Sequence, residues 1–142
     1  MATTRTASAV WKGSLIEGAG EVALVSSGAG SYPVSWPARA MQPNGVTSPE
    51  ELIAAAHASC YCMALSHGLT GVGTAPESLE AQAAVTFEPG TGIIGIVLTV
   101  RGSVPGLSAE EFAAAAEVAR RNCPVSQALG GVPITLASVE LG

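Results

Sequence analysis

Three cysteines, Cys60, Cys62 and Cys123, are the residues of this sequence whose type and spacing suit chemistry. Cys60 and Cys62 lie in one apolar stretch that is expected to be helical. Side chains two residues apart on a helix diverge by about 200°, so these two thiols do not bond each other there. A cysteine on an apolar helix is commonly an inert packing residue, and burial raises the pKa of a thiol. Cys60 therefore needs a cationic neighbour to react as a thiolate.

Cys123 has a different local setting. It is followed by Pro124, which suits the first position of a short helix, and this places Cys123 at the N-cap. There a thiolate would face backbone N–H groups and the positive end of the helix dipole. On local physics alone, Cys123 is the thiol that ionises more easily.

Few polar residues are available to assist a thiol. Arg39 is the only basic residue between Lys12 and Arg101, and it precedes the loop that leads into the apolar helix. Glu50 and Glu51 lie at the start of that helix, where acidic side chains also serve the dipole and the capping pattern.

Two histidines flank Cys60. His57 lies one helical turn before it and His67 seven residues after it, so the three side chains can share a face. With Cys123 added, this set permits a metal site, which is the alternative to redox chemistry. The spacing is not a standard zinc pattern, however, and no further clustered ligands are present.

A glycine-rich stretch, residues 90–95, matches the pattern GxGxxG. A dinucleotide-binding fingerprint needs a strand before this pattern and a helix after it, so that phosphate meets the helix N-terminus. The apolar, β-branched run that follows here predicts a strand instead. We interpret residues 90–95 as a hairpin turn.

The composition limits the fold class and the partners. A chain of 142 residues is the size of a single domain, here residues 1–142. Only 12% of the residues are charged, about half the usual share of roughly 25%. So few charges cannot cover a surface well, which favours burial against another subunit.

The charge and the cysteine content limit which partners and which cellular compartment are expected. The net charge is −5, and the only adjacent basic pair is Arg120–Arg121, so neither nucleic acid nor an anionic membrane is an expected partner. No secretory signal is expected, because no apolar run precedes Lys12. An odd number of cysteines then predicts free thiols in a reducing compartment, the cytoplasm.

Apolar periodicity and turn residues predict an α+β fold with mainly antiparallel strands. The predicted strands are residues 4–11 (a weak candidate), 22–25, 32–36, 79–88, 93–100 and 132–141. Helices are predicted over residues 52–66 and from Ser108 to about Asn122, each announced by a capping box, with Glu51 and Glu111 in the fourth position.

The first of these helices is apolar on every side, which predicts a helix surrounded by protein. No charged residue occurs between Glu51 and Glu77, so the stretch resembles a membrane span. Its apolar part is interrupted by histidines and glycines and falls short of the ~20 residues that a bilayer requires. We therefore interpret it as a buried core helix, with no membrane as partner.

Two separated motifs resemble those of the OsmC/Ohr family of thiol peroxidases, and the position of Arg39 fits its OsmC branch better than its Ohr branch. The first is Thr-Ser-Pro-Glu-Glu-Leu-Ile-Ala-Ala-Ala-His-Ala-Ser-Cys over residues 47–60, followed by Met-Ala-Leu-Ser at 63–66. The second is Cys-Pro-Val-Ser-Gln-Ala-Leu over residues 123–129. Together with Ala-Val-Trp-Lys-Gly at 9–13, the resemblance covers essentially the whole chain.

The resemblance implies roles for individual residues. Cys60 corresponds to the cysteine that attacks the peroxide, and Cys123 to the one that resolves the product into a disulfide. Arg39 and Glu50 correspond to the arginine and glutamate that activate Cys60, with Arg5 and Glu51 as the alternatives. Cys62 departs from the family pattern and is not expected to be redox-active.

The resemblance also implies a fold in which antiparallel sheets wrap around central helices in an intertwined homodimer. Glu50 and Cys60 are ten residues apart, about 15 Å along a straight helix. Either the helix breaks between them, or Arg39 or a second chain bridges the gap. The sparse surface charge favours the second chain.

The function implied is reduction of organic hydroperoxides, and hydrogen peroxide to some extent, by Cys60. A disulfide with Cys123 would follow, and an external dithiol of the dihydrolipoamide type would reduce it. Apolar neighbours such as Leu52, Tyr61 and Met63 suit an organic substrate. No metal or organic cofactor is required. The alternative is a non-catalytic dimeric domain, with His57, Cys60, His67 and Cys123 as metal ligands.

Overall fold

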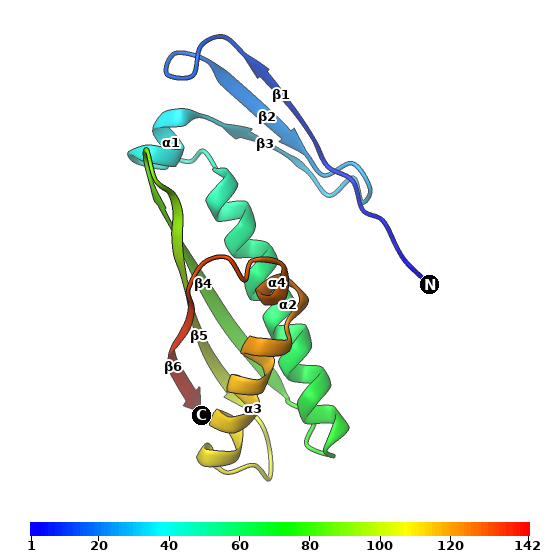
Figure 1. Ribbon diagram of the computed structural model, residues 1–142. Coiled ribbons are helices and arrows are strands. Elements are labelled where there is room, and N and C mark those ends of the chain that lie inside the picture. The colour runs from blue at the N-terminus through cyan, green and yellow to red at the C-terminus, as the bar shows by residue number, and fades with distance from the viewer. The chain divides into compact units, whose positions relative to one another are not determined.

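The computed structural model describes residues 1–142 as two compact units, Met1–Leu52 and Ile53–Gly142. Each unit holds one three-stranded sheet, and Figure 1 labels the elements. The strands are β1 (Ser8–Lys12), β2 (Ala19–Ala23), β3 (Ser31–Val34), β4 (Ser78–Glu88), β5 (Gly92–Ser103) and β6 (Ile134–Leu141). The helices are α1 (Trp36–Ala40), α2 (Pro49–Gly71), α3 (Ala109–Asn122) and α4 (Pro124–Ala128). The α+β class predicted from the sequence is confirmed, whereas the single domain stays a prediction.

The first unit is an antiparallel sheet in the order β1–β2–β3, followed by the short helix α1. The sequence predicted the last strand to include Trp36, which is wrong, because the chain turns into α1 there. Ser35 caps α1, its hydroxyl accepting the N–H of Ala38 at 3.2 Å, and Pro37 lies in the first turn. This Ser-x-Pro signal was present in the sequence and was overlooked.

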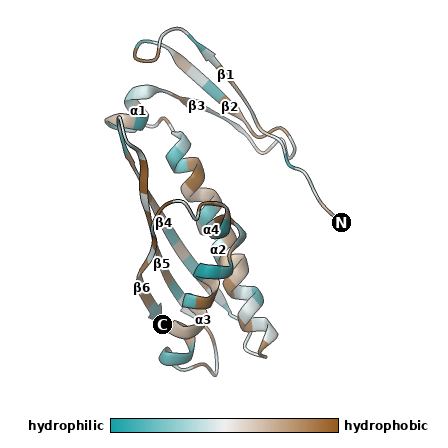
Figure 2. Ribbon diagram, viewed as in Figure 1, coloured by the Kyte–Doolittle hydropathy of each residue, from teal (hydrophilic) through white to brown (hydrophobic).

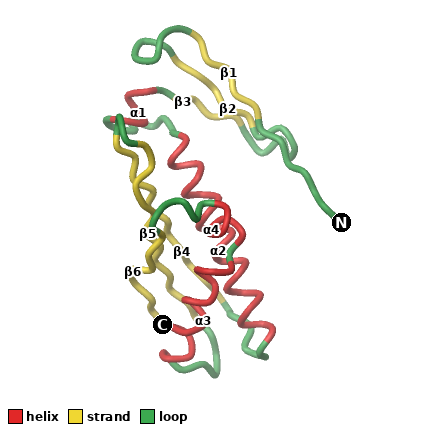
Figure 3. The backbone as a smooth tube through the Cα atoms, viewed as in Figure 1, coloured by secondary structure: helices red, strands yellow, loops and turns green.

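Helix α2 begins where the sequence predicted and ends later. Ser48 accepts the N–H of Glu51 at 3.2 Å, but the Glu51 carboxylate bonds the Thr47 hydroxyl and not the Ser48 N–H, so the capping box is only half formed. The helix continues past Ser66 to Gly71 without a break (Figure 3). The break suggested between Glu50 and Cys60 is therefore absent.

The predicted burial of α2 is only partly correct. At 23 residues the helix is long and apolar enough to span a membrane by length and composition, so the expectation that it falls short is wrong. One of its faces is fully buried inside the second unit, through His57, Tyr61, Leu65 and Leu69. The opposite face of α2 is exposed to solvent in the single chain, although the sequence predicted that other parts of the protein would cover the helix on every side.

The second unit places α2 and α3 on one face of the sheet β4–β5–β6 (Figure 1). β4 and β5 form an antiparallel hairpin whose turn is built on Gly90 and Gly92, both at positive φ. The interpretation of the glycine pattern as a turn is therefore confirmed. β6 pairs with β5 in parallel, because α3 and α4 form a crossover that returns the chain to the same end of the sheet.

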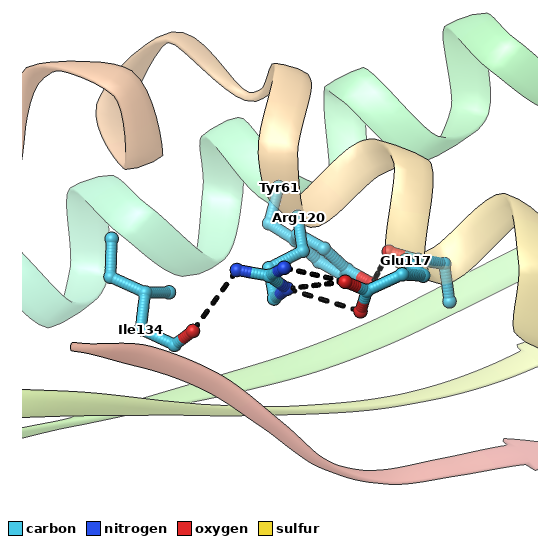
Figure 4. A network of polar contacts seen from close by, with 5 residues as sticks. Tyr61, Glu117, Arg120 and Ile134 are labelled. Carbon is cyan, nitrogen blue, oxygen red and sulfur yellow. Dashed lines mark hydrogen bonds and ion pairs between the residues drawn. The ribbon is translucent and has the colours of Figure 1, made fainter. Parts of the chain in front are cut away.

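The core of this unit lies between the apolar run of β5, brown in Figure 2, and the two helices. Its fully buried side chains include Tyr61, Leu98 and Phe112. At the C-terminal end of α3, Arg120 binds Glu117 and donates to the carbonyl of Ile134 at 3.1 Å (Figure 4). These contacts tie α3 to the start of β6.

Gly102 marks the closest approach of α3 to β5. A Cβ atom placed there would lie 2.6 Å from the ring of Phe112, which is fully buried and cannot move aside. We expect Gly102→Ala to lower the free energy of unfolding by about 1–3 kcal/mol, measured by urea denaturation. Gly95→Ala is the matched control, since its Cβ would meet nothing closer than 3.6 Å, and we expect a change within about 0.5 kcal/mol. Equal effects of the two substitutions would contradict this account of the packing.

Candidate active site

The second unit brings two of the three thiols together. Cys60 lies on α2 and Cys123 at the junction of α3 and α4, and their side chains lie close enough for the Cys123 thiol to raise the pKa of Cys60. Cys60 is partly exposed, whereas Cys123 is fully buried, and no cysteine forms a disulfide. Two residues 63 positions apart in the sequence therefore meet in the fold, as the resemblance implied.

The first turn of α4 supplies a backbone donor to one of these thiols. Cys123 is the N-cap of α4 and Pro124 follows it, as predicted, but the Cys123 side chain makes no capping hydrogen bond. The N–H of Val125 donates to the sulfur of Cys60 instead. The prediction that the helix start would serve Cys123 is thus wrong in its geometry, because the amide of α4 is directed at the thiol of the neighbouring helix.

Burial dominates the electrostatics of Cys60. It raises the pKa of the thiol above its ordinary value, and the neighbouring Cys123 thiol raises it further, while the N–H of Val125 lowers it. The sequence predicted this upward effect of burial on the Cys60 pKa, and the direction is confirmed. A cation close to the sulfur would be needed to offset it.

Arg39 and Glu50 form an ion pair in the first unit. The Nε of Arg39 donates to both carboxylate oxygens of Glu50, at 3.0 and 3.1 Å, and Nη2 donates at 2.9 Å. Glu50 is buried. The alternatives lie elsewhere: Arg5 donates to the Thr4 carbonyl, and Glu51 is exposed and bonded to Thr47. Of these four residues, Arg39 and Glu50 are the two that form an ion pair with each other. Which arginine and which glutamate activate Cys60 stays a prediction. The approach of Arg39 to the Cys60 thiolate stays a prediction.

We expect Arg39→Ala to destabilise the protein, because it leaves the buried Glu50 carboxylate without its partner. The loss should be about 2–3 kcal/mol in urea denaturation, below the cost for a fully buried pair, since the Arg39 side chain is 32% exposed. The double variant Arg39→Met/Glu50→Gln should recover much of this loss. A loss below about 0.5 kcal/mol in Arg39→Ala would show that the pair contributes little.

Cys62 is held apart from the other thiols. Its S–H donates to the Leu79 carbonyl at 4.0 Å and its sulfur accepts the N–H of Ala81, both on β4. Burial raises the pKa of this thiol. These contacts are those of a packing residue.

The alternative metal set does not assemble. No group of three or more histidine, cysteine, aspartate or glutamate side chains in the chain is placed to hold a metal ion. His57 is fully buried and its Nε2 lies 2.8 Å from the hydroxyl of Ser126, whereas His67 is exposed. The contact between His57 and Ser126 was not anticipated, because nothing in the sequence links two residues 69 positions apart.

The predicted apolar neighbours of the thiol differ in their exposure, and Leu52 is half-buried. Tyr61 is fully buried, with its hydroxyl donating to the Ala116 carbonyl at 2.8 Å, and Met63 is 72% exposed. An apolar cavity of about 220 Å³ lies elsewhere in the second unit. It is lined by Ile53, Ile93, Ile96, Ala128, Leu129, Gly131 and Val132. Ile53 precedes Cys60 by two turns of α2, so the cavity adjoins the same helix.

These features define an α+β protein with a partly exposed helical thiol that contacts a second, buried thiol. The OsmC-like protein family matches residues 42–137 of this chain. Peroxiredoxin OsmC of Escherichia coli (strain K12) is 38% identical over 122 residues, which cover 84% of this chain and 85% of that protein. The chain belongs to the OsmC/Ohr family.

Further relatives agree with this assignment. The organic hydroperoxide resistance protein of Xanthomonas axonopodis pv. citri is 31% identical over 97 residues, 63% of this chain and 65% of the relative. The structure of an organic hydroperoxide resistance protein OsmC from Legionella pneumophila has a TM-score of 0.69 at 26% identity, covering 95% of this chain and 96% of the other. An OsmC-like protein from Mycoplasma pneumoniae shares the fold, with a TM-score of 0.75 at 14% identity and full coverage of both chains.

Proposed function

We propose that this protein is a thiol-dependent peroxidase that reduces organic hydroperoxides to alcohols. The observation that carries the proposal is the contact between the Cys60 and Cys123 thiols within one unit. The names of its relatives, a peroxiredoxin and an organic hydroperoxide resistance protein, support a peroxidase-like role.

The reaction proceeds in three balanced steps. The Cys60 thiolate attacks the terminal oxygen of ROOH, the O–O bond breaks, and a proton goes to the departing alkoxide to give ROH and a Cys60 sulfenic acid. The Cys123 thiol then attacks that sulfur, releasing water and forming a disulfide. An external dithiol, of the dihydrolipoamide type, restores both thiols by exchange and is itself oxidised. No metal or organic cofactor takes part.

In this proposal Arg39 supplies the cation and Glu50 orients it. The guanidinium stabilises the Cys60 thiolate and offsets the effect of burial, while the Glu50 carboxylate orients the guanidinium through its bidentate contact. Because α2 is unbroken, the rise of ten residue steps from Glu50 to Cys60 is about 15 Å, which favours a site completed by a second chain.

The apolar lining of the cavity beside α2 supports an organic hydroperoxide as the substrate class. A pocket without charged or polar side chains favours an alkyl or aryl hydroperoxide over hydrogen peroxide, because the hydrophobic effect adds to the binding of the carbon skeleton. The compartment proposed is the cytoplasm, where free thiols persist.

A homodimer is the proposed assembly. None of the residues in β1, β2 and β3 is buried, and a sheet needs a covered face to be stable. The exposed face of α2 carries small and apolar residues, Ala55, Ala56, Ser59 and Met63 among them. Sedimentation equilibrium should give twice the 14.1 kDa of one chain, and a monomer at micromolar concentration would contradict the assembly.

Steady-state consumption of cumene hydroperoxide, with dihydrolipoamide as reductant, tests the function. We expect turnover with a higher kcat/KM for cumene hydroperoxide than for hydrogen peroxide. If the reduced, dimeric protein consumes neither peroxide, the function proposed is wrong, and a non-catalytic dimeric domain becomes the better account.

A further inference from the structure

A buried hydrogen bond joins α2 to α4 one turn away from Cys60. The Nε2 of His57 lies 2.8 Å from the Oγ of Ser126. His57 has no exposed surface and Ser126 only 6%, so solvent does not compete for this bond. The bond has no part in the chemistry proposed above.

The helix held by this bond carries both groups that contact Cys60. The Val125 N–H, which donates to the Cys60 sulfur, directly precedes Ser126, and Cys123 is the N-cap of the same helix. With five residues, α4 is too short to be stable by itself, so tertiary contacts fix its place. The bond between His57 and Ser126 is one such contact, and it lies within a turn of both sulfur atoms along each helix.

The protonation state of His57 indicates which of the two side chains donates in this hydrogen bond. Its Nδ1 is buried without a hydrogen-bond partner, and burial lowers the pKa of the ring, which keeps the imidazole neutral. A buried acceptor without a partner is tolerated better than a buried N–H without one. The proton therefore belongs on Nε2, which donates to the Ser126 hydroxyl. The loss of Ser126 would leave that N–H unpaired.

We propose that His57 and Ser126 are a positioning pair, which holds the first turn of α4 against α2 so that the Val125 N–H stays directed at the Cys60 sulfur. The inference rests on the proposed function, in which Cys60 is the reacting thiol. Its test is independent of turnover, since it measures the reduced protein before any peroxide is added.

The measurement is the pH dependence of Cys60 alkylation by iodoacetamide in the full-length reduced protein, read by peptide mass spectrometry. Ser126→Ala removes the acceptor and frees the Val125 N–H, whereas Cys123 is still held at the end of α3 by its own N–H, which donates to the Ala119 carbonyl. Because only the group that lowers the pKa is lost, we expect the apparent pKa of Cys60 to rise by about one unit, a tenfold loss of thiolate below the pKa. Ser126→Thr keeps the hydroxyl and should restore the wild-type pKa.

Two further variants separate positioning from stability. His57→Leu/Ser126→Ala replaces both polar partners by apolar groups, so its unfolding temperature should recover toward wild type while the raised Cys60 pKa remains. Tyr61→Phe deletes another buried hydrogen bond of α2, to α3, and should lower the unfolding temperature without moving the Cys60 pKa.

A wild-type Cys60 pKa in the stable double variant would overturn the inference, as would an equal rise in Tyr61→Phe. Each of these results is distinguishable from failure of the proposed function. A protein without peroxidase activity can still show the shift in pKa, and an active peroxidase can lack it.

Discussion

Cys60→Ser should abolish hydroperoxide consumption, with a fall in kcat/KM of at least about four orders of magnitude. A serine hydroxyl at this position remains protonated near neutral pH and cannot form a sulfenic acid. The Val125 N–H and the Cys123 thiol would then contact an unreactive oxygen. The loss is measured as the rate of cumene hydroperoxide consumption by the reduced protein.

Cys62→Ser is the matched control for this substitution. Cys62 lies two residues away on the same helix, is also partly exposed, and carries a thiol whose pKa is raised by burial. Its contacts are with the backbone of β4, so its removal should leave kcat/KM within about twofold of wild type. A similar loss in both variants would mean that the effect comes from disturbing α2. Unchanged activity in Cys60→Ser would refute the assignment of the reacting thiol.

Removal of Cys123 should leave the first turnover intact and slow every turnover after it. In Cys123→Ser the sulfenic acid still forms on Cys60, but no thiol lies in contact to condense with it. The steady-state rate with an external dithiol should fall by about 10²-fold or more, because an oriented neighbouring group is worth a high effective concentration. Dimedone should then trap one sulfenic acid per chain, found on Cys60 by mass spectrometry.

Cys123→Ala is the control that separates loss of the resolving thiol from misfolding in the Cys123→Ser variant. Cys123 is fully buried, so serine places a hydroxyl in the core, whereas alanine leaves only a small cavity. The two variants should behave alike in the dimedone assay. Wild-type turnover without a dimedone adduct in either would show that Cys123 does not resolve the product.

Local signals in the sequence predicted most of the elements that carry the site. Ser48 and Pro49 mark the start of α2, and Ser108 with Glu111 forms a complete capping box at the start of α3. The end of α2 was misjudged, because Gly68 is tolerated within a helix that packs on the core through Leu65 and Leu69. The parallel direction of β6 was not evident either, since alternation of side chains does not report strand direction.

The contacts within the site depend on tertiary packing, which local sequence signals do not predict. The preference of thiolates for helix N-termini predicted that the start of α4 would stabilise a Cys123 thiolate. The Val125 N–H is directed at Cys60 instead, because the start of α4 lies against α2. The pairing of Cys60 with Cys123 came from the family resemblance. The ion pair of Arg39 with Glu50 also followed from it, and α1, which presents Arg39, was missed.

The most direct test of the account is the map of the cysteines after one equivalent of cumene hydroperoxide. Peptide mass spectrometry of the full-length protein should find Cys60 linked to Cys123 within one chain, at a loss of two hydrogen masses, with Cys62 still alkylatable. Three alkylatable thiols per chain, or a disulfide that involves Cys62, would contradict it.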